Sequence, residues 1–401
     1  MEKVFPDHLL PVYHRADIAF LYGEGPYLFA ANGRRYLDFV AGIAVSSLGH
    51  NHPYLSGALK SQVDKLLHVS NLYRVPEQER LARRLCENSF AHGIYFCNSG
   101  AEAIEGAIKM ARRTHFGEGN AARNRIITMQ QAFHGRTMGA LAATGNPKYL
   151  EGFGPAPGGF DQVEANDSQA VEAAITAQTA AVMFEPVLAE GGILPISKEV
   201  FSSIRKLCDR NDLLLIVDEV QTGVGRTGQL FAHEWAAIKP DIMTLAKGLG
   251  GGVPIGAICV SERVAKHMIP GTHGSTFSGN PLAMSAGNAV LDVVLAPGFI
   301  VGVNRVSRHL FARGKTLVDE FPHLFKETRG RGLLFGLKCK VPNTDLVNAA
   351  FDAGLLCHVA GDNVLRLLPP LIVTEGHVDE AFEILRSVAA RYDINHSVAQ
   401  E

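Results

Sequence analysis

The chain has 401 residues, of which 47% are hydrophobic and 19% charged, and its formal net charge at pH 7 is −2. This length suits two or three domains with a sizeable core, and the composition excludes an intrinsically disordered chain. Because there is no basic excess, we expect neither nucleic acid nor an anionic membrane surface as a partner. No apolar run approaches the ~20 residues of a membrane-spanning helix.

The cysteines of the chain form no C-x-x-C pair, and none has a histidine at metal-ligand spacing. They are Cys86, Cys97, Cys208, Cys259, Cys339 and Cys357. We expect them to be small buried residues in a reducing cytoplasm rather than disulfide partners. His50 and His52 have no third ligand nearby in the sequence, so no metal site is expected. The first residues lack the apolar core of a signal peptide.

The first 50 residues contain short alternating runs. Residues 27–39 predict a β-hairpin, because Asn32-Gly33 is a favoured hairpin turn. A glycine-spaced loop follows at 42–50, and residues 55–67 have helical spacing. This part of the chain therefore precedes the regular alternation of helices and strands.

From about residue 76, helical patterns alternate with short apolar strands. Predicted helices cover 77–86, 101–115 and 198–210, and predicted strands cover 94–97, 125–129, 180–184, 213–217, 242–245 and 255–260. Apolar strands separated by helices indicate a mostly parallel sheet with both faces covered.

The last third of the chain has a different pattern. Residues 280–321 predict helix with a break at Pro297-Gly298, and a smaller α+β region begins after residue 329. Its strand candidates cover 332–338, 355–358 and 364–368, and a terminal helix covers 378–392.

One lysine stands at a position where chemistry is expected. Residues 242–245 predict a buried strand, which is followed by Lys247 and the glycine-rich turn 248–252. In open α/β sheets, ligands bind where the strands leave the core. A lysine with little water around it has a lowered pKa, and its neutral amine attacks aldehydes. We interpret Lys247 as a Schiff-base lysine for pyridoxal phosphate; the plainer alternative is a solvated surface charge.

A carboxylate ends a neighbouring strand. The apolar run 213–217 leads directly to Asp218, and a carboxylate there must face a ligand, a cation or water. Against a pyridine nitrogen it would keep the ring protonated and electron-withdrawing. The alternatives for Asp218 are a helix cap or a Mg²⁺ ligand. The next residue, Glu219, points the other way and is expected to be structural.

Two further strand ends carry polar groups. Ser99, Gly100 and Ala101 open a predicted helix, whose free N–H groups suit a phosphate; the alternative is plain N-capping by Ser99. Phe133 could stack on a cofactor ring, and Arg136 could pair with a substrate carboxylate. Taken singly, Phe133 is more typical of a core residue and Arg136 of a surface residue.

These stretches occur together in one family. The chain resembles the class III, fold-type I pyridoxal-phosphate aminotransferases over nearly its whole length. The stretches that carry the resemblance are 36–39, 42–45, 48–50, 98–103, 133–137, 185–187, 217–223, 246–248 and 274–277. The resemblance implies an α/β fold with a large domain, whose mostly parallel seven-stranded sheet is covered by helices, and a smaller α+β domain from both termini.

The resemblance also implies domain boundaries. Residues 1–50 would form the N-terminal segment of the small domain, 51–280 the large cofactor-binding domain, and 281–401 the C-terminal small domain. It further implies a cytoplasmic homodimer with active sites at the subunit interface. Thr276 would reach the phosphate bound in the neighbouring subunit, with Ser275 beside it as a further phosphate or substrate contact.

The remaining cofactor roles come from the same resemblance. Lys247 would be the point of cofactor attachment and the proton shuttle, and Asp218 the partner of the pyridine nitrogen. Gln221 would reach the ring hydroxyl. The phosphate cradle and the stacking ring would be Ser99, Gly100, Ala101 and Phe133.

Within the family, the chain is most similar to the group that acts on N²-acetylornithine in arginine biosynthesis. Its ω-amino group would pass to 2-oxoglutarate, giving N-acetylglutamate 5-semialdehyde and glutamate. Arg136 would hold the distal carboxylate of either substrate. Arg366 would hold the α-carboxylate of glutamate, and Glu190 would mask Arg366 while the bare CH₂ of the diamine lies there.

The chain departs from the family pattern at a few positions. Leu188-Ala189 stand where relatives usually have Gln-Gly, and Ser278 and Ser46 replace a usual Gly and Asn. Because alanine lacks glycine's freedom at positive φ, we expect Ala189 to make the masking loop less mobile.

Three alternatives stay open from the sequence. The first is a related ω-aminotransferase for succinylornithine, N-succinyl-diaminopimelate, ornithine or 4-aminobutyrate. A nucleotide-binding α/β protein using residues 248–252 is disfavoured, because no G-x-G-x-x-G motif follows the first strand. A non-catalytic binding module is disfavoured because both Lys247 and Asp218 are present.

Overall fold

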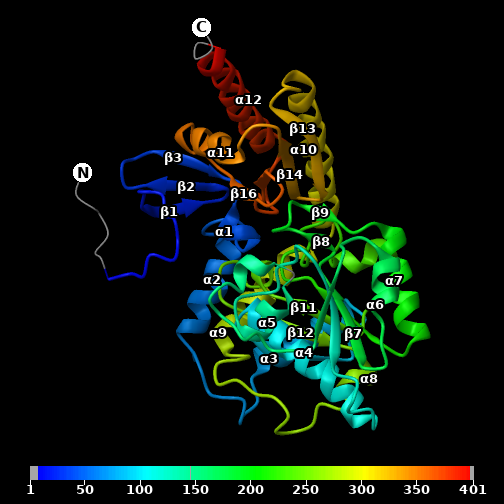
Figure 1. Ribbon diagram of the computed structural model, residues 1–401. Helices are drawn as coiled ribbons and strands as arrows, with labels where there is room; N and C mark the ends of the chain where they lie inside the picture. Colours follow the sequence, from blue (N-terminus) through cyan, green and yellow to red (C-terminus); the bar gives the residue numbers. More distant parts are fainter. Residues whose placement is uncertain (1–7, 145, 398–401) are drawn as a thin grey trace.

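The computed structural model describes residues 8–144 and 146–397, which form a large body and a smaller one stacked on it (Figure 1). The large body is built around a seven-stranded sheet, and the smaller one around two four-stranded sheets. The short elements α1 (Ala41–Ala44), β8 (Val187–Leu188) and β9 (Leu194–Pro195) lie at the junction of the two bodies (Figure 1).

The large sheet has the strand order β4-β12-β11-β10-β7-β5-β6. Its strands are β4 (Gly93–Cys97), β5 (Arg125–Met129), β6 (Phe160–Val163), β7 (Thr179–Phe184), β10 (Leu214–Asp218), β11 (Ile242–Leu245) and β12 (Gly256–Val260). In this sheet β12 runs antiparallel to both of its neighbours, and the other pairings are parallel. The predicted fold class, with a mostly parallel seven-stranded sheet, is confirmed.

Helices cover both faces of this sheet. Leu214 and Ile216 of β10 pack in the cluster that contains α4 (Gly100–Gly117), whereas Leu215 and Val217 pack in the cluster that contains α7 (Lys198–Arg210). Successive side chains of a strand point to opposite faces, so a strand covered on both sides is apolar at every position. This explains why the run 213–217 is continuous rather than alternating.

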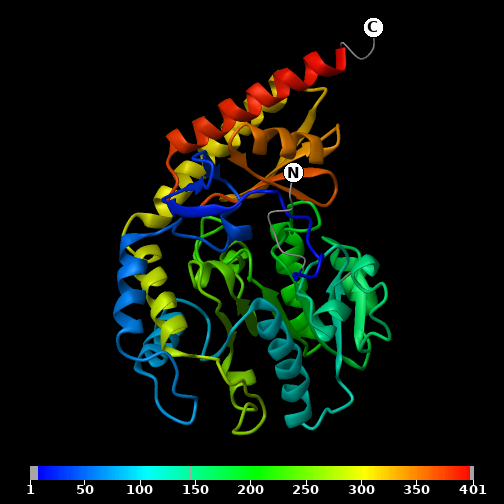
Figure 2. The same ribbon diagram turned by 90° about the vertical axis from the view of Figure 1, so that its left-hand side faces the viewer.

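The remaining helices of the large body pack beside β4, β11 and β12. They are α2 (Pro53–Val63), α3 (Pro76–Glu87) and α9 (Pro281–Val294), with the short helices α5 (Met138–Ala143), α6 (Ser168–Ala174) and α8 (Glu262–Ala265) elsewhere on the body. Figure 2 shows α2 and α9 side by side, although more than 200 residues separate them in the chain.

The smaller body combines both ends of the described chain. Its first sheet has the order β1-β2-β3-β15, from β1 (Phe20–Glu24), β2 (Tyr27–Ala30), β3 (Arg35–Asp38) and β15 (Leu355–Leu356). Its second sheet has the order β13-β14-β17-β16, from β13 (Phe325–Arg331), β14 (Leu334–Cys339), β16 (His358–Ala360) and β17 (Val364–Leu367). Because β3 pairs in parallel with β15, the N-terminal hairpin and the C-terminal region form one unit.

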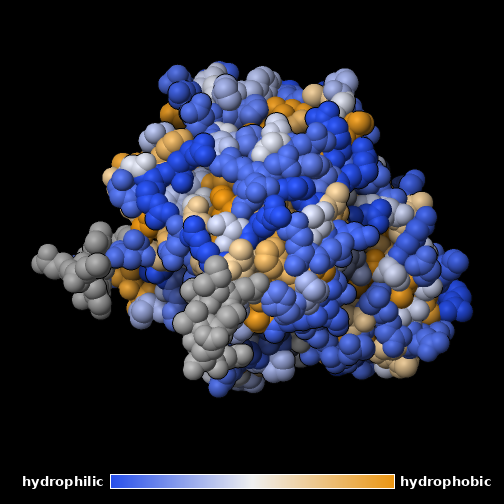
Figure 3. Space-filling model, turned by 90° about the horizontal axis from the view of Figure 1, so that it is seen from above, coloured by the Kyte–Doolittle hydropathy of each residue, from blue (hydrophilic) through white to orange (hydrophobic). Residues whose placement is uncertain are grey.

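Three helices complete the smaller body: α10 (Phe299–Glu320), α11 (Asn343–Asp352) and α12 (Glu375–Ser397). Seen from above, the outer face of this body is mostly hydrophilic (Figure 3). The bend between α9 and α10 falls at the expected Pro297-Gly298 break. Within the described residues, no single helix is both long and apolar enough to cross a membrane; α9 and α10 meet that test only as a pair bent by 72°.

The loop before α2 contains an unusual backbone turn. Ala41, Gly42, Ile43 and Ala44 all have positive φ, between 49° and 64°. L-residues pay about 1–2 kcal/mol each for a left-handed helical conformation, so the turn needs support from its surroundings. Asp38 Oδ1 accepts hydrogen bonds from the backbone N–H groups at both Val40 and Ala41, each at 2.9 Å.

Candidate active site

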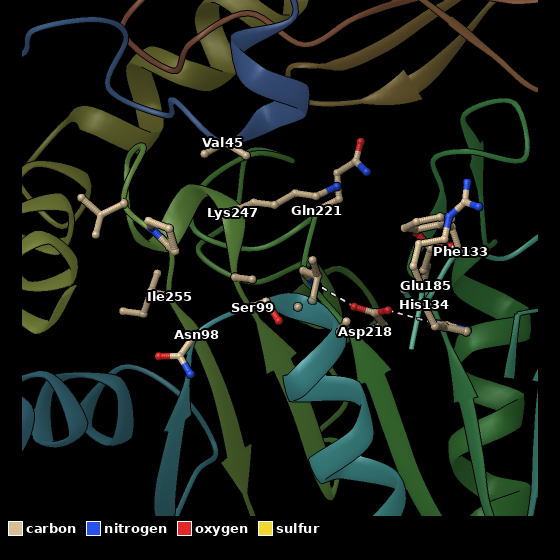
Figure 4. A pocket seen from close by; sticks show the side chains of 18 of the residues that line it. Val45, Asn98, Ser99, Phe133, His134, Glu185, Asp218, Gln221, Lys247 and Ile255 are labelled. Carbon is tan, nitrogen blue, oxygen red and sulfur yellow. Dashed lines mark hydrogen bonds and ion pairs between the residues drawn. The ribbon is translucent and has the colours of Figure 1, made fainter. Parts of the chain in front are cut away.

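A cavity of about 460 Å³ lies where β10 and β11 end and α4 begins (Figure 4). Most of the side chains predicted to bind the cofactor or substrate line it together: Ser99, Gly100, Ala101, Phe133, Arg136, Asp218, Gln221 and Lys247. The lining also includes His134 and Glu185, which had no predicted role. Val45, next to the left-handed turn, lies above Lys247 in Figure 4 and forms the roof.

Lys247 follows the end of β11 and has a φ of 40°, in the left-handed region. Strained residues of this kind concentrate at functional sites. Burial lowers the pKa of the Lys247 amine to about 8, although the negative charge of Glu190 works in the opposite direction. The backbone beside it is anchored from the roof, because Ser47 Oγ donates to the Gly248 carbonyl at 2.8 Å. The site therefore holds a lysine that is readily deprotonated.

Asp218 is held by donors on both of its oxygens. Its Oδ1 accepts from Thr244 Oγ1 at 3.1 Å and from the Val220 N–H at 3.0 Å, and its Oδ2 lies 2.7 Å from His134 Nδ1. Asp218 is buried, with 3% of its surface exposed. These contacts hold the carboxylate in one fixed orientation.

His134 is a residue that sequence reasoning missed. It is buried, and its Nε2 has no hydrogen-bond partner among the described residues. It stood in the 133–137 stretch, but nothing in the sequence indicated that its ring would meet Asp218, 84 positions further along. With Nδ1 bonded to the carboxylate, His134 orients Asp218 from the side opposite Val220.

Ser99 caps the N-terminus of α4 and also lines the cavity, which are the two alternatives that the sequence suggested for it. Its Oγ accepts from the Glu102 N–H at 3.2 Å, which is N-capping of α4, and the same residue lines the cavity. The next residue must be small, since a Cβ on Gly100 would come within 2.8 Å of Val220 Cγ1. The start of an 18-residue helix therefore faces the cavity with a bare backbone, an arrangement that suits a phosphate.

Glu185 is the second missed residue. Its Oε2 accepts from the Phe133 N–H at 2.9 Å, so it holds the loop that carries the stacking candidate. Burial, and then the nearby Asp218 charge, raise the pKa of the Glu185 carboxyl well above its ordinary value.

Close by, the Gln221 Oε1 is buried and has no partner within the described part of the chain. Gln221 thus presents an unused acceptor toward the cavity.

Arg366 and Glu190 form an ion pair at the junction of the two bodies. Arg366 Nη1 lies 2.5 Å from Glu190 Oε1, and the arginine is buried, with 1% exposed. Burial raises the pKa of Glu190, but the charge and hydrogen bond of Arg366 outweigh it, so the net pKa is lowered and Glu190 is ionised. The Glu190 and Arg366 side chains are therefore in direct contact, which the masking hypothesis requires.

The expectation that Ala189 makes the masking loop less mobile stays a prediction. The backbone at Ala189 shows how alanine fits where relatives usually have glycine. It does not have a positive φ, so alanine fits there without strain; the positive φ values of this loop fall on Gly192 and Ile193. The substitution of the usual glycine by Ala189 is therefore no obstacle to the backbone conformation seen here.

Arg136 is exposed at the mouth of the cavity. Its guanidinium lies 4.1 Å from the centre of the Tyr149 ring and 5.6 Å from that of Phe133. None of the ion pairs between described residues involves Arg136. A stacked arginine whose donors are not used by a protein carboxylate is well placed to bind an anionic substrate group.

Ser275 and Thr276 do not line this cavity. Ser275 Oγ lies 3.2 Å from Asn98 Nδ2. Ser278, which stands where relatives usually have glycine, donates to the Ser275 carbonyl at 3.0 Å. Thr276 is exposed. In a single chain, Ser275 therefore touches the cavity wall only through Asn98, and Thr276 is not part of the cavity lining.

The cavity suits pyridoxal 5′-phosphate on structural grounds. A bare helix start is available for the phosphate, a fixed carboxylate for the pyridine nitrogen, and a buried unpaired amide oxygen for the ring hydroxyl. A lysine of lowered pKa is available for the aldehyde.

The family model of class III aminotransferases matches residues 12–389. The chain therefore belongs to the class III aminotransferases, enzymes that use pyridoxal 5′-phosphate. Among curated relatives, the acetylornithine aminotransferase of Brucella melitensis is 53% identical over 98% of this chain and 97% of its own, and that of Rhodobacter capsulatus is 49% identical over 95% and 97%. The predicted family, cofactor and enzyme class are confirmed.

Solved structures give the same assignment. N-acetylornithine aminotransferase from Stenotrophomonas maltophilia has a TM-score of 0.84 and 37% identity, covering 96% of this chain and 98% of that one. The ornithine aminotransferase of Toxoplasma gondii has a TM-score of 0.93 at 29% identity, covering 97% and 94%. Both solved structures have backbones similar to that of this chain, although the two enzymes are named for different donors. The backbone alone therefore does not decide the donor.

Proposed function

We propose that this enzyme transfers the ω-amino group of N²-acetylornithine to 2-oxoglutarate, giving N-acetylglutamate 5-semialdehyde and glutamate, as a step of arginine biosynthesis. The names of its relatives at about 50% identity support this donor. The structural observation that carries the proposal is the Glu190–Arg366 pair together with a second arginine, Arg136, that has no carboxylate partner among the described residues.

Lys247 would be the acid–base group of the reaction. Bound pyridoxal phosphate supplies an electron sink for the carbon that loses its proton. Lys247 would hold the cofactor through its amine and, with the donor bound, would take the proton from the δ-carbon of the donor and give it up again within the site. Its lowered pKa keeps part of the amine neutral near pH 8, which proton abstraction requires.

Asp218 would keep the pyridine nitrogen protonated. Its contacts with Thr244, Val220 and His134 hold the carboxylate stationary, so it is preorganised for that task. Gln221 would accept from the ring hydroxyl, and Phe133 would cover the face of the ring. The Glu185 contact with the Phe133 N–H holds that ring-bearing loop in place.

The two arginines explain how one pocket accepts two unlike substrates. Both substrates have a carboxylate far from the reacting carbon, and Arg136 would bind it. Glutamate has a second carboxylate beside the reacting carbon, whereas the diamine has only CH₂ there. With Glu190 paired, Arg366 is neutralised for the diamine; with Glu190 turned aside, Arg366 binds the α-carboxylate of glutamate.

A homodimer is part of the proposal. The loop with Thr276 also carries Phe277, which is 64% exposed, and the neighbouring loop exposes Leu72 and Tyr73 at 83% and 69%. Asn71 Nδ2 donates to the Ser278 carbonyl at 2.8 Å, so the two loops form one apolar patch. Covering this patch with a second subunit would carry Thr276 to the partner's phosphate. The cytoplasmic location stays a prediction.

The test is an absorption spectrum of the purified protein, followed by half-reactions. We expect a visible band of lysine-bound cofactor that collapses on adding N²-acetylornithine and returns with 2-oxoglutarate. A band that ignores acetylornithine but responds to ornithine or 4-aminobutyrate would replace the donor and keep the reaction type. A protein without any band after addition of pyridoxal phosphate would overturn the role of Lys247.

A further inference from the structure

The loop that carries Glu190 is buried on both sides of that residue. It consists of residues 189–193 and joins β8 to β9, which pair antiparallel. Of these residues only Glu190 reaches solvent in part, with 26% of its side chain exposed, and the other four are buried. The Glu190 side chain therefore has space beside it, whereas the backbone that carries it is enclosed.

One side of this backbone is covered by the turn 361–363 of the smaller body, which joins β16 to β17. The Gly361 N–H donates to the Glu190 carbonyl at 2.9 Å. A Cβ on Gly361 would lie 2.6 Å from the same carbonyl oxygen, so only glycine allows this close approach. The turn and the Glu190 loop are thus in direct backbone contact.

Two further contacts hold the loop just after Glu190. Gly191 packs on the large body, because a Cβ on Gly191 would lie 2.8 Å from the Gln131 carbonyl oxygen. Arg329 Nη1, from the smaller body, donates to the Gly192 carbonyl at 3.4 Å. The backbone next to Glu190 is therefore held by both bodies.

The turn itself is firmly attached to its sheet. Asp362 and Asn363 have φ values of 50° and 51°, in the left-handed region that aspartate and asparagine adopt more readily than other side chains. Asp362 pairs with Arg329 of β13 at 2.7 Å and with Lys338 of β14 at 2.6 Å. Asn363 Nδ2 donates to the Val341 carbonyl at 2.8 Å. These bonds fix the position of the turn relative to the strands beside it.

The same hairpin carries the partner of Glu190. In the pairing of β16 with β17, Ala360 lies opposite Val364 at the turn, and His358 lies opposite Arg366. Arg366 Nη1 reaches Glu190 Oε1 at 2.5 Å. One hairpin thus contains both the arginine and the turn that holds the backbone of the glutamate.

We propose that Gly361 and Asp362 are positioning residues for the exchange of substrates: their turn fixes the backbone of Glu190 and thereby sets where its carboxylate meets Arg366. The inference rests on the proposed function, because it takes Glu190 as the group that covers Arg366 while an ω-amine is bound. A buried ion pair is favourable only when its geometry is good. A displaced Glu190 backbone would therefore leave Arg366 partly unpaired, although neither Gly361 nor Asp362 touches the substrate.

Gly361→Ala tests the backbone contact directly. The φ of Gly361 lies outside the left-handed region, so alanine is allowed there, but its Cβ would press on the Glu190 carbonyl. The acetylornithine half-reaction should slow about tenfold, because a displaced Glu190 leaves the buried Arg366 partly unpaired beside a bare CH₂. The glutamate half-reaction should change little, since a substrate carboxylate then pairs with Arg366. Stopped-flow absorbance measures each half-reaction alone.

Gly158→Ala is the matched control. Gly158 is an exposed loop glycine whose φ is also outside the left-handed region, and a Cβ there meets no atom of the described residues within 4 Å. Both half-reactions should keep their wild-type rates. Equal slowing of the two half-reactions by Gly361→Ala, or no slowing of either, would overturn the positioning role.

A double variant separates positioning from general damage to the site. In Glu190→Ala the carboxylate is gone, so a shift of its backbone has nothing to misplace. The ratio of the two half-reaction rates in the variant with both Glu190→Ala and Gly361→Ala should therefore equal that in Glu190→Ala alone. A ratio that changes further would show that the turn acts by another route and would contradict the proposal.

Asp362→Asn tests the ion pairs that hold the turn, and it perturbs the fold less than Gly361→Ala. Asparagine keeps the size of the side chain and tolerates the φ of 50°, but it loses the charge that pairs with Arg329 and Lys338. The acetylornithine half-reaction should slow about threefold, as expected for a partly exposed ion pair. Asp209→Asn weakens a remote ion pair, with Arg205 at 2.8 Å, and should leave the ratio of half-reactions unchanged. A wild-type ratio in Asp362→Asn would remove Asp362 from the proposal.

The outcomes separate this inference from the proposed function. An asymmetric effect of Glu190→Ala together with a symmetric effect of Gly361→Ala overturns the positioning role and leaves the masking by Glu190 intact. Equal slowing of both half-reactions by Glu190→Ala overturns both. If another ω-amine replaces acetylornithine as the donor, the same ratios are measured with that amine, because the carbon next to its amine is also a CH₂.

Discussion

The active site has a floor, formed by Lys247 and Asp218, and a rim, formed by Arg366, Glu190 and Arg136. The two are built in different ways. On the floor, Asp218 is fixed by three donors from separate parts of the chain. On the rim, Arg366 has one carboxylate partner, Glu190, and Arg136 rests on an aromatic ring with no anion. Groups that act on the cofactor do the same task in both half-reactions and can be rigid. Groups that meet the substrates must exchange partners, because the two substrates differ.

Loss of the floor lysine should have the largest effect. Lys247→Ala removes both the attachment point and the proton-transfer group, so kcat should fall by about 10⁴-fold, the upper end for a positioned acid–base residue. The visible band of lysine-bound cofactor should be missing while the circular dichroism stays that of the wild type. Retention of that band would show that another amine holds the cofactor.

The next largest effect is expected for Asp218, and it distinguishes this carboxylate from the adjacent Glu219. Asp218→Asn cannot hold the pyridine nitrogen protonated, so kcat should fall by about 10²–10³-fold, as for the loss of one preorganised electrostatic contact. Glu219→Gln is the matched control. Glu219 accepts from the Ala232 and His233 N–H groups at 2.6 Å and 2.9 Å, so its change should cost about 1–3 kcal/mol of stability with little change in kcat. Similar loss of kcat in both would contradict the assignment.

A rim substitution should have a smaller and asymmetric effect. Glu190→Ala leaves the buried Arg366 without a partner whenever the diamine is bound, an unsatisfied charge worth about tenfold or more. The acetylornithine half-reaction should slow more than the glutamate half-reaction, in which Arg366 has a carboxylate ligand. Stopped-flow absorbance measures each half-reaction alone, and equal slowing would rule out the masking role.

The smallest effect expected is a pH dependence. The Lys247 amine has a pKa of about 8, below its ordinary value because of burial, so it is mostly protonated below pH 8 and neutral above it. Only the neutral amine attacks an aldehyde, so reconstitution of the cofactor-free protein should speed up about tenfold per pH unit below pH 8 and then level off. A rate still rising steeply above about pH 9 would indicate an ordinary lysine.

The floor was largely predictable from the sequence because its signals are local. Residues 213–217 and 242–245 are apolar runs followed at once by Asp218 and by the stretch with Lys247, and parallel strands bring their ends to one edge. The structure reports both strands within a residue of the predicted bounds. The start of the helix after Ser99 was predictable for the same reason, because a serine is a typical N-cap residue.

The missed features depend on contacts between distant residues. The strand β13 was not predicted, because it is polar and only partly buried, and α11 is a short helix without a strong pattern. The meeting of His134 with Asp218, and of Glu185 with the Phe133 backbone, joins positions 84 and 52 apart. The pocket lined by Gln131 and Asp362 forms only where the two bodies face each other. No periodicity in the chain records such contacts.

The left-handed turn at Ala41–Ala44 has a consequence for the order in which the protein can be completed during translation. Its flanks are tied to residues more than 300 positions further along the chain: the Leu368 N–H donates to the Phe39 carbonyl at 2.6 Å, and the Leu371 N–H donates to the Ser47 carbonyl at 2.7 Å. A growing chain that has finished the central sheet still lacks these donors. Residues up to Leu371 must therefore be synthesised before the roof can close, so Lys247 is made well before the roof above it is complete.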